Sequence, residues 1–347
     1  MTSAHPFPHR LLGSTSVAVS RLGFGAAALG NLYRVISDES AQSSLSAALA
    51  AGIAYVDTAP HYGQGLSERR VGAGLSDGIT LSTKVGRVLT PVTPPPAPGT
   101  ERHGFIDGDP FEPNFDYTYD GVMRSFEASQ ARLKRERIDI LLAHDLGEVT
   151  HGDDAKGHMK AFLDGGYKAM RALKDQGLVG AIGLGVNESE VCEEVMAQVE
   201  IDAILLAGRY TLLEQTTLDR FLPACQAKNI SIILGGPFNS GILVEGIKGD
   251  TVPHYNYEAA PPHIIHRVRA LQSVCASHSV PLAAAALQFP LAHPAVACVI
   301  PGMADAAQVK ANVALFETEI PAALWDDLKS EGLLHDAAPI PKARILS

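Results

Sequence analysis

Short apolar segments alternate with segments of helical periodicity along almost the whole chain. Eight apolar segments have the length of buried strands, and helical patterns separate nearly all of them. Alternation at that count predicts a closed parallel (β/α)8 TIM barrel, because an open doubly wound sheet more typically has fewer strands and a glycine-rich turn after the first. The segment GFGAAALG, after the first expected strand, lacks the third glycine of such a turn. The expected strands span residues 22–25, 53–57, 80–84, 138–144, 179–183, 203–206, 230–234 and 296–300.

The other patterns fit around this barrel. Two β-like pieces flank Gly13 within residues 9–24 and predict an N-terminal β-hairpin. The first helix is expected to begin after Ser37, because Asp38 and Glu39 then lie in its first turn, where acids suit the helix dipole. We expect residues 1–347 to form one barrel domain with this hairpin and extra helices. Later helices are expected at residues 66–74, 119–134, 158–176, 188–199, 215–228, within 262–292 and at 305–316.

One long insertion interrupts the alternation. Residues 86–117 contain seven prolines and three phenylalanines. Proline at this density disfavours helix and the interior of a sheet, and a loop this long is usually a functional lid or a disordered segment. The aromatic residues and the position directly after Lys84 favour a lid.

Acidic residues outnumber basic ones. The 38 Asp and Glu residues and 28 Lys and Arg residues give a formal net charge of −10. This balance argues against binding to nucleic acid or to acidic membrane surfaces unless a local basic patch outweighs it. The dense basic run Arg132, Lys134, Arg135 and Arg137 lies at the end of an expected helix, where the dipole favours cations, so we expect a solvated helix end.

Cysteine usage and the N-terminus indicate the compartment. The four cysteines show neither CxxC spacing nor clustering, which predicts reduced thiols and no disulfides. The opening segment MTSAHPFPHRLL lacks the apolar core of a signal peptide, and no apolar run approaches the roughly 18 residues of a membrane helix. We expect a soluble cytoplasmic protein.

Three consecutive strands end in ionisable side chains. The strand IAYV runs into Asp57, the strand TLST into Lys84, and the strand IDILLA into His144, while Tyr62 follows Asp57 after a short loop. In parallel α/β folds, catalytic groups gather at the carboxyl ends of the strands. We therefore expect Asp57, Tyr62, Lys84 and His144 to form one catalytic site.

These residue types suit proton exchange with a carbonyl or an alcohol. A nearby lysine ammonium should lower the pKa of Tyr62 from its usual value of about 10, and Asp57 should hold that ammonium in place. His144 adds a second donor or acceptor with a pKa near neutrality. None of these side chains can donate or accept a hydride, so a redox reaction would need a nicotinamide cofactor.

Each residue also has a structural explanation. A histidine after a strand can be a hydrogen-bonded core residue, and Tyr62 can be a rim aromatic. Lys84 is the strongest signal, because lysine is almost never buried without a partner. His263 and His266 lie one helical turn apart, yet no third ligand is evident, so we expect a surface pair and no metal site.

These motifs resemble the aldo-keto reductase family. GIAYVDTAPHYGQGLSE, residues 52–68, is similar to the family signature around the Asp and Tyr. STK and IDILLAHD are similar to its lysine and histidine strands, and IGLGVN and VIPGMADAAQVKAN to two further blocks. The resemblance covers nearly the full length and implies the tetrad Asp57, Tyr62, Lys84 and His144.

The resemblance also implies where a nicotinamide cofactor would bind. Asn187 would hold the nicotinamide carboxamide, and a set of loop residues would approach the rest of the cofactor. Apart from the resemblance, the position of Arg209 at the end of an expected strand fits either contact with substrate hydroxyls or packing at the rim. The implied cofactor-binding residues are Gly25, Asn187, Gly236, Pro237, Phe238, Gly302, Gln308 and Asn312.

The chain departs from the family pattern at two places. Gly302 and Gln308 stand where many NADP-dependent members have basic residues for the 2′-phosphate, and Asp305 lies nearby, so NAD is the expected cofactor and NADP the alternative. Ala207 and Gly235 stand where many members have a glutamine and an aromatic residue against the nicotinamide. We therefore expect looser contact there or contact through other residues.

Two blocks point to a reaction. Residues 115–127 and 235–243 are similar to a subgroup of sugar and pyridoxal dehydrogenases, whose substrates are cyclic hemiacetals. The resemblance implies oxidation of the hemiacetal hydroxyl of an aldose such as L-fucose, or of pyridoxal, to a lactone. The alternatives are an NADPH-dependent reductase of small aldehydes and a cofactor-binding redox-sensing subunit with negligible turnover. The sequence does not decide between sugar and pyridoxal, or the oligomeric state.

Overall fold

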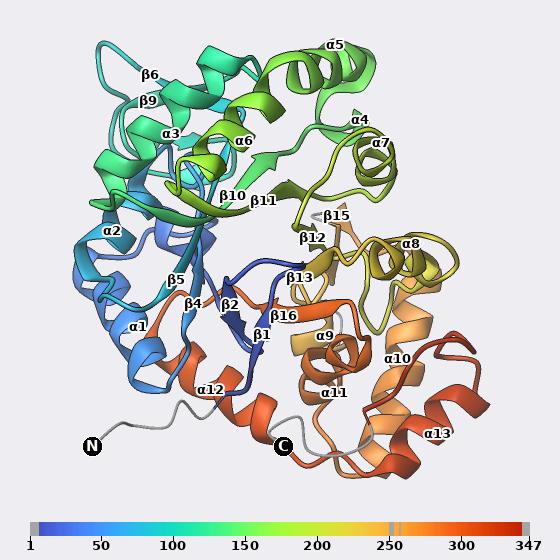
Figure 1. The fold of residues 1–347 in the computed structure, drawn as a ribbon. Coiled ribbons are helices and arrows are strands. Elements are labelled where there is room, and N and C mark those ends of the chain that lie inside the picture. Colours follow the sequence, from blue (N-terminus) through green and yellow to red (C-terminus); the bar gives the residue numbers. More distant parts are fainter. Residues whose placement is uncertain (1–6, 250–252, 257, 342–347) are drawn as a thin grey trace, which may run out of the picture.

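Eight parallel strands form a barrel that closes on itself. The computed structural model describes residues 7–249, 253–256 and 258–341. The strand order is β16-β13-β12-β11-β10-β5-β4-β3, and parallel bridges from Leu22 to Val299 and from Gly25 to Gly302 join the two ends of the sheet (Figure 1). The predicted (β/α)8 barrel is therefore confirmed. Its strands are β3 Phe24–Gly25, β4 Tyr55–Asp57, β5 Thr80–Val85, β10 Ile138–His144, β11 Val179–Val186, β12 Ala203–Ala207, β13 Ser231–Gly235 and β16 Val296–Ile300.

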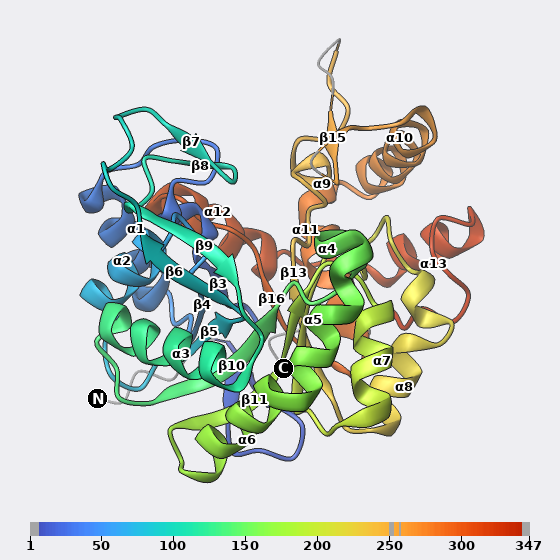
Figure 2. The same ribbon diagram turned by 90° about the horizontal axis from the view of Figure 1, so that it is seen from above.

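Helices surround the barrel and connect its strands (Figure 2). The expected helix at 158–176 is interrupted by a π-helical segment at Phe162–Gly166, and α13 near the end of the chain was not predicted individually. Ser37 caps the first helix, because its hydroxyl oxygen accepts a bond from the amide of Ser40, as the acid-rich first turn predicts. The helices are α1 Asp38–Ala50, α2 Leu66–Gly74, α3 Tyr119–Leu133, α4 Glu148–His151, α5 Ala155–Ala161, α6 Tyr167–Asp175, α7 Glu190–Gln198, α8 Phe221–Ala227, α9 Ile242–Glu245, α10 Pro262–Ser277, α11 Leu282–Gln288, α12 Ala306–Glu317 and α13 Ala322–Ser330.

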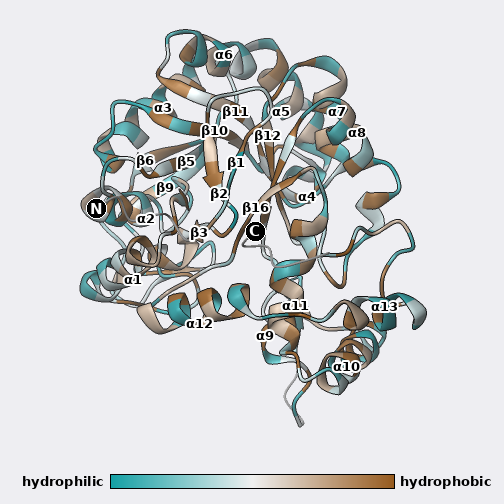
Figure 3. Ribbon diagram, turned by 60° about the horizontal axis from the view of Figure 1, so that its bottom comes forward, coloured by the Kyte–Doolittle hydropathy of each residue, from teal (hydrophilic) through white to brown (hydrophobic). Residues whose placement is uncertain are grey.

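Alternate strand residues fill two different cores. Within β10, Ile140 and Leu142 belong to the cluster inside the barrel, whereas Leu141 and Ala143 pack against the helices. This is the period-two alternation of a strand that is covered on both faces. Figure 3 shows hydrophobic residues along the strands and residues of both kinds on the helices. The barrel interior is thus a packed core.

The predicted N-terminal hairpin covers the amino-terminal end of the barrel. Strands β1 (His9–Leu11) and β2 (Ala18–Ser20) pair antiparallel. The turn between them is attached to the barrel, because the amide of Gly13 donates to the hydroxyl of Ser231 at 2.9 Å. Leu12, Val17 and Val19 extend the interior cluster at this end. Chemistry is therefore confined to the opposite end of the barrel.

The proline-rich insertion is an ordered lid, and part of it is β-structure, contrary to the prediction. Strand β6 (Arg87–Pro91) pairs antiparallel with β9 (Phe111–Phe115), and β7 (Glu101–Arg102) pairs with β8 (Phe105–Ile106). Pro91 and Pro113 are tolerated because they lie at the alternate positions of the ribbon whose amides face away from the partner strand, so no ladder bond is lost. The lid lies beside the barrel mouth, opposite the hairpin of β14 (His254–Tyr255) and β15 (Glu258–Ala259) (Figure 2).

Part of the basic run at the end of α3 is not a solvated helix end, which corrects the prediction. The Nε atom of Arg132 donates to the fully buried carboxylate of Glu68 at 2.6 Å. The other Glu68 oxygen accepts from the hydroxyl of Thr83, the residue before Lys84. The side chain of Arg132 is only 17% exposed. This ion pair therefore joins α2 and α3 to the strand that carries Lys84.

The remaining sequence features are placed simply. All four cysteines, Cys192, Cys225, Cys275 and Cys298, are buried free thiols. Within the described residues, no single helix is long and apolar enough to cross a membrane; α10 and the segment Leu282–Ala292 pass such a test only as a pair bent by 101°.

The Glu68–Arg132 pair gives a prediction about stability. Arg132→Met should lower the free energy of unfolding by about 3–5 kcal/mol, because it leaves a buried carboxylate without its cation. Urea denaturation followed by circular dichroism measures this. Arg124→Met, which removes an ion pair to Asp116 from an arginine that is 56% exposed, is the control and should cost under about 1 kcal/mol. Equal effects of the two variants would contradict the assignment.

Candidate active site

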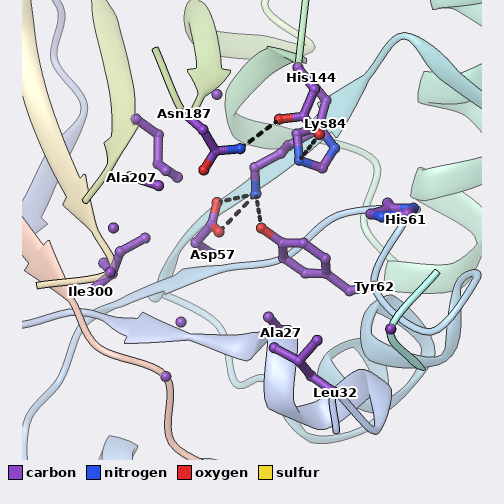
Figure 4. A pocket seen from close by; sticks show the side chains of 18 of the residues that line it. Ala27, Leu32, Asp57, His61, Tyr62, Lys84, His144, Asn187, Ala207 and Ile300 are labelled. Atoms are coloured by element: carbon purple, nitrogen blue, oxygen red, sulfur yellow. Dashed lines mark hydrogen bonds and ion pairs between the residues drawn. The ribbon is translucent and has the colours of Figure 1, made fainter. Parts of the chain in front are cut away.

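Three strands and one loop bring the predicted tetrad together at the carboxyl end of the barrel. Asp57 ends β4, Lys84 lies in β5, and His144 ends β10, while Tyr62 lies in the loop between β4 and α2. In the strand register, Lys84 lies two residues beyond Ser82, the partner of Asp57, and His144 lies two residues beyond Leu142, the partner of Lys84. Figure 4 shows their side chains converging on one cavity.

Lys84 is the centre of the cluster. Its Nζ atom donates to both carboxylate oxygens of Asp57, at 3.0 and 2.8 Å, and to the backbone oxygen of Thr58 at 2.9 Å. It also donates to the hydroxyl oxygen of Tyr62 at 3.1 Å. Lys84 and Asp57 are 1% and 2% exposed, so water cannot replace these partners. Burial lowers the pKa of Lys84, but Asp57 and Tyr62 outweigh it and raise the pKa, so the side chain is an ammonium.

A close contact between two glycines fixes the backbone beside Tyr62. Gly63 has a φ of +63°, and a Cβ atom there would lie 2.4 Å from the backbone oxygen of Gly30. A Cβ atom on Gly30 would in turn lie 2.6 Å from the carbonyl carbon of Tyr62. Only glycine fits both positions, and their contact holds Tyr62 against Lys84.

The predicted lowering of the Tyr62 pKa is wrong in this structure. Burial raises the pKa of Tyr62 to about 12, and the opposing effect of Lys84 recovers only part of the shift. Desolvation of the phenolate is the larger cost, because the hydroxyl lies deep in the barrel mouth. Tyr62 is therefore a neutral phenol that donates a proton readily only to a stronger base or a developing alkoxide.

His144 is also neutral. Burial and the nearby cations Arg87 and Lys84 hold its pKa well below the usual 6.5. Its ring centroid lies 5.9 Å from that of Tyr62, in an edge-to-face arrangement. The expectation of a near-neutral pKa is therefore wrong, and the imidazole serves as a hydrogen-bond group without charge.

A cavity of about 450 Å³ contains the tetrad. Of the residues implied for cofactor binding, Gly25, Asn187, Gly236 and Gly302 line it. Its wall also includes Ala207 and Gly235, the two positions that depart from the family pattern. Glycine has no side chain and alanine has only a methyl group, so this wall leaves room for a flat ring close to the backbone.

The other four implied cofactor residues do not line this cavity. Pro237 is buried, and Phe238 packs against the helical core. The side-chain oxygen of Gln308 accepts from the amide of Ala304. Asn312 is 7% exposed, its amide nitrogen donates to the backbone oxygen of Gln308, and its side-chain oxygen is buried without a partner. This polar atom in the middle of α12 suits a hydrogen-bond donor of a bound ligand.

Sequence reasoning missed several cavity residues. Asp145 and His61 each adjoin a tetrad residue in the sequence, and Phe105 belongs to the lid. Arg87 begins β6 and donates to Asp145 at 2.6 Å. The lysine, histidine and tyrosine motifs carried no signal for these residues, because their roles depend on how the lid folds back.

Two weaker candidates also have defined places. The Nε atom of Arg209 donates to the backbone oxygen of Asn187 at 2.6 Å, and its NH1 atom to the side chain of Asn256 at 3.3 Å. Arg209 therefore joins the end of β11 to the β14–β15 hairpin. His263 and His266 are exposed on α10, and no group of three or more metal-ligating side chains occurs among the residues that the structure describes.

Comparison with known proteins identifies the family. Residues 21–331 match the model of the aldo/keto reductase family. This chain belongs to the aldo-keto reductases. Family members use nicotinamide cofactors, and the small-residue wall beside Asn187 and the tetrad fits a nicotinamide ring.

Individual relatives of this aldo-keto reductase are similar over most of its length. It is 42% identical to a pyridoxal 4-dehydrogenase from Microbacterium luteolum, covering 94% of this chain and 97% of that protein. It is 37% identical to a D-threo-aldose 1-dehydrogenase from Pseudomonas sp, covering 92% and 96%. The holo form of an aldo-keto reductase from Bacillus halodurans has a TM-score of 0.73 at 25% identity, covering 97% and 98%.

The raised pKa of Tyr62 predicts the pH dependence of the reaction. If Tyr62 is the proton acceptor, as the sequence predicts, oxidation of an alcohol requires its phenolate form, and below a pKa of about 12 the phenolate fraction rises with pH. The value of kcat/KM for oxidation should therefore rise between about pH 7 and pH 10 in steady-state assays. His144 stays neutral over this range. Tyr62→Phe should lose the rise, and a pH-independent rate in the unaltered enzyme would contradict the role of Tyr62.

Proposed function

We propose that this aldo-keto reductase oxidises the hydroxyl of a cyclic hemiacetal to a lactone, with NAD as the oxidant. The observation that carries the proposal is the contact of Tyr62 with buried Lys84, at the end of a cavity whose other wall suits a nicotinamide. The two dehydrogenases at 42% and 37% identity support the substrate class, because aldoses and pyridoxal both form cyclic hemiacetals.

Tyr62 and His144 would divide the work on the substrate hydroxyl. The hydroxyl proton would pass to Tyr62 in its phenolate form, while His144 holds the same oxygen by a hydrogen bond. Lys84 stabilises the tyrosine oxygen when it is negative, and Asp57 keeps the ammonium in place. Bound NAD supplies the acceptor for the hydrogen that leaves the ring carbon with its electron pair. The carbon–oxygen bond becomes the carbonyl of the lactone, and NADH and one proton are released.

The walls beyond Tyr62 favour a flat aromatic substrate. His61 lies edge-to-face with Phe105 at a centroid distance of 5.4 Å and lies 5.8 Å from His103. Burial, with Arg87, lowers the pKa of His61 to about 3, so the ring is uncharged. Aromatic and imidazole faces stack well on a pyridine ring, whereas a sugar with several hydroxyls needs more carboxylates and amides. Pyridoxal is therefore the preferred substrate in this proposal.

The adenosine end supports NAD over NADP. Asp305 caps α12 by accepting from the amide of Gln308 at 2.9 Å, and it forms an ion pair with Arg34 at 2.9 Å. The carboxylate would repel a 2′-phosphate, and Arg34 is already paired with it. Gly302 offers no charge.

One observation favours reduction of a small aldehyde as the second candidate function. A Tyr62 pKa of about 12 makes the phenol neutral, and a neutral phenol is the form that donates a proton to a carbonyl oxygen. The positive charge of oxidised nicotinamide would lower this pKa again and restore the oxidative direction.

A substrate comparison tests the proposed function. The unaltered enzyme should oxidise pyridoxal with NAD more efficiently than L-fucose, L-galactose or D-arabinose, measured as kcat/KM from NADH absorbance. Lactone formation is checked by mass spectrometry. Tyr62→Phe should lose about 10²- to 10⁴-fold in kcat because the proton acceptor is gone, while its Kd for NADH stays nearly unchanged. Efficient reduction of small aldehydes with NADPH and no oxidation of any hemiacetal would establish the second candidate.

Cofactor preference is a separate prediction. The ratio of kcat/KM with NAD to kcat/KM with NADP should be above one, and Asp305→Asn should raise the efficiency with NADP severalfold while leaving that with NAD nearly unchanged. Asparagine keeps the helix cap and removes only the charge. A strong preference of the unaltered enzyme for NADP would contradict the prediction.

A further inference from the structure

Asp145 lies at an unusual point of the backbone. It directly follows His144 at the end of β10 and has a φ of +51°, in the left-handed region that few residues other than glycine adopt. Its amide donates to the backbone oxygen of Gly185 at 2.9 Å, and the hydroxyl of Tyr117 donates to the backbone oxygens of His144 at 2.6 Å and Asp145 at 3.1 Å. These bonds hold the strained turn, and both His144 and Asp145 consequently line the cavity.

The Asp145 carboxylate contacts two cavity residues, His144 and Asn187, and also Arg87 of the lid. Its Oδ2 atom accepts from the NH2 atom of Arg87 at 2.6 Å and lies 3.4 Å from Nε2 of His144. Its Oδ1 atom accepts from the side-chain nitrogen of Asn187 at 3.3 Å. The side chains of Asp145 and Arg87 are 11% and 10% exposed. One carboxylate thus lies against the histidine proposed to hold the substrate oxygen, the residue implied for the nicotinamide carboxamide, and the first residue of the lid strand β6.

These contacts bias the His144 ring toward one tautomer. A neutral imidazole carries one N–H group. The Nδ1 atom of His144 is buried without a partner, so a proton there would leave an unpaired buried donor. A proton on Nε2 instead faces the negative charge of Asp145. The lack of a partner for Nδ1 and the negative charge of Asp145 therefore both favour the tautomer with its proton on Nε2.

The same carboxylate sets the direction of the Asn187 amide. A carboxylate accepts hydrogen bonds and cannot donate them, so Asn187 must turn its NH2 group toward Asp145. Its side-chain oxygen is left to accept from an NH2 group in the cavity. A carboxamide has such a group.

We propose that Asp145 is the positioning residue that fixes the tautomer of His144 and the direction of the Asn187 amide, and so aligns the proton-transfer and cofactor sides of the cavity. Arg87 neutralises its charge and ties this alignment to the lid. The roles given to His144 and Asn187 rest on the proposed function, whereas the contacts of Asp145 do not. A purely structural Arg87–Asp145 ion pair would stabilise the lid without affecting either neighbour.

Asp145→Asn separates these two explanations. The asparagine oxygen can still accept from Arg87, but its NH2 group then meets the NH2 group of Asn187, so Asn187 must turn. We expect the Kd for NADH, measured by fluorescence titration, to rise about tenfold, which is the loss expected for one hydrogen bond between two neutral amides, those of Asn187 and the cofactor. Asn187→Ala should weaken NADH binding similarly, and the double variant should bind no more weakly than Asn187→Ala alone. An unchanged Kd for Asp145→Asn, or fully additive losses in the double variant, would overturn the coupling.

Asp202→Asn is the matched control. Its carboxylate also pairs with a cation, Lys174, at 2.6 Å, and its side chain is 15% exposed, but it lies at the opposite end of the barrel. It should lower the melting temperature and leave the Kd for NADH unchanged. An equal rise in Kd for Asp202→Asn would show that any loss of a buried ion pair weakens binding, and would overturn the proposal.

The tautomer is tested without turnover. Long-range ¹H–¹⁵N spectra of the unaltered protein labelled with ¹⁵N-histidine distinguish Nε2–H from Nδ1–H, and the His144 signals are those missing in His144→Gln. We expect Nε2–H in the unaltered protein and a measurable share of Nδ1–H in Asp145→Asn, because only the lack of a partner for Nδ1 then opposes that form. A protonated Nδ1 in the unaltered protein would overturn the proposal even if the Asp145 variant does not fold. Because neither readout needs a substrate, failure of the proposed hemiacetal oxidation would leave both results interpretable.

Discussion

The buried ammonium of Lys84 is the interaction on which the site depends. A charge that is 1% exposed is tolerable only when its desolvation is offset, and here two carboxylate oxygens, a backbone oxygen and a phenol oxygen surround it. These partners come from β4 and the loop that follows it, so β4 and β5 must pair in one register. Around Lys84, the barrel supplies the geometry: Ser82 supports Asp57, and Glu68 with Arg132 secures the strand beside it.

The buried surroundings hold the Lys84 ammonium among its partners, but they also disfavour the charged forms of two neighbouring residues. The environment that fixes Lys84 also disfavours the phenolate of Tyr62 and the protonated form of His144. The site thus consists of one fixed ion pair, Asp57 with Lys84, and two neutral groups. Such a site can bind the substrate oxygen either as a hydroxyl or as a carbonyl. The charge of the bound cofactor would then favour oxidation or reduction.

The lid links substrate selection to the catalytic groups. Phe105 pairs with Leu32 through a backbone bridge and packs edge-to-face against His61, so the aromatic wall exists only when the lid is in place. The guanidinium of Arg87, at the start of β6, donates to Asp145 and lies over the ring of Phe115, with its central carbon 4.5 Å from the ring centroid. The lid therefore contacts both the aromatic wall of the cavity, formed by Phe105 and His61, and, through Arg87 and Asp145, the residue next to His144.

The sequence by itself determined the eight-stranded barrel and the four residues at its mouth, because period-two strands, helical spacing and polar residues at strand ends are local patterns. It also indicated that residues 86–117 cover the site. Only the tertiary structure decided that proline-containing segments pair as two-stranded ribbons, that Arg132 reaches a buried carboxylate, and that Pro237, Phe238, Gln308 and Asn312 lie away from the main cavity. It also decided the protonation states of Tyr62 and His144 and the position of Asp145. Such properties depend on burial and on neighbours distant in the sequence, since desolvation and ion pairing arise only where the folded chain brings those groups together.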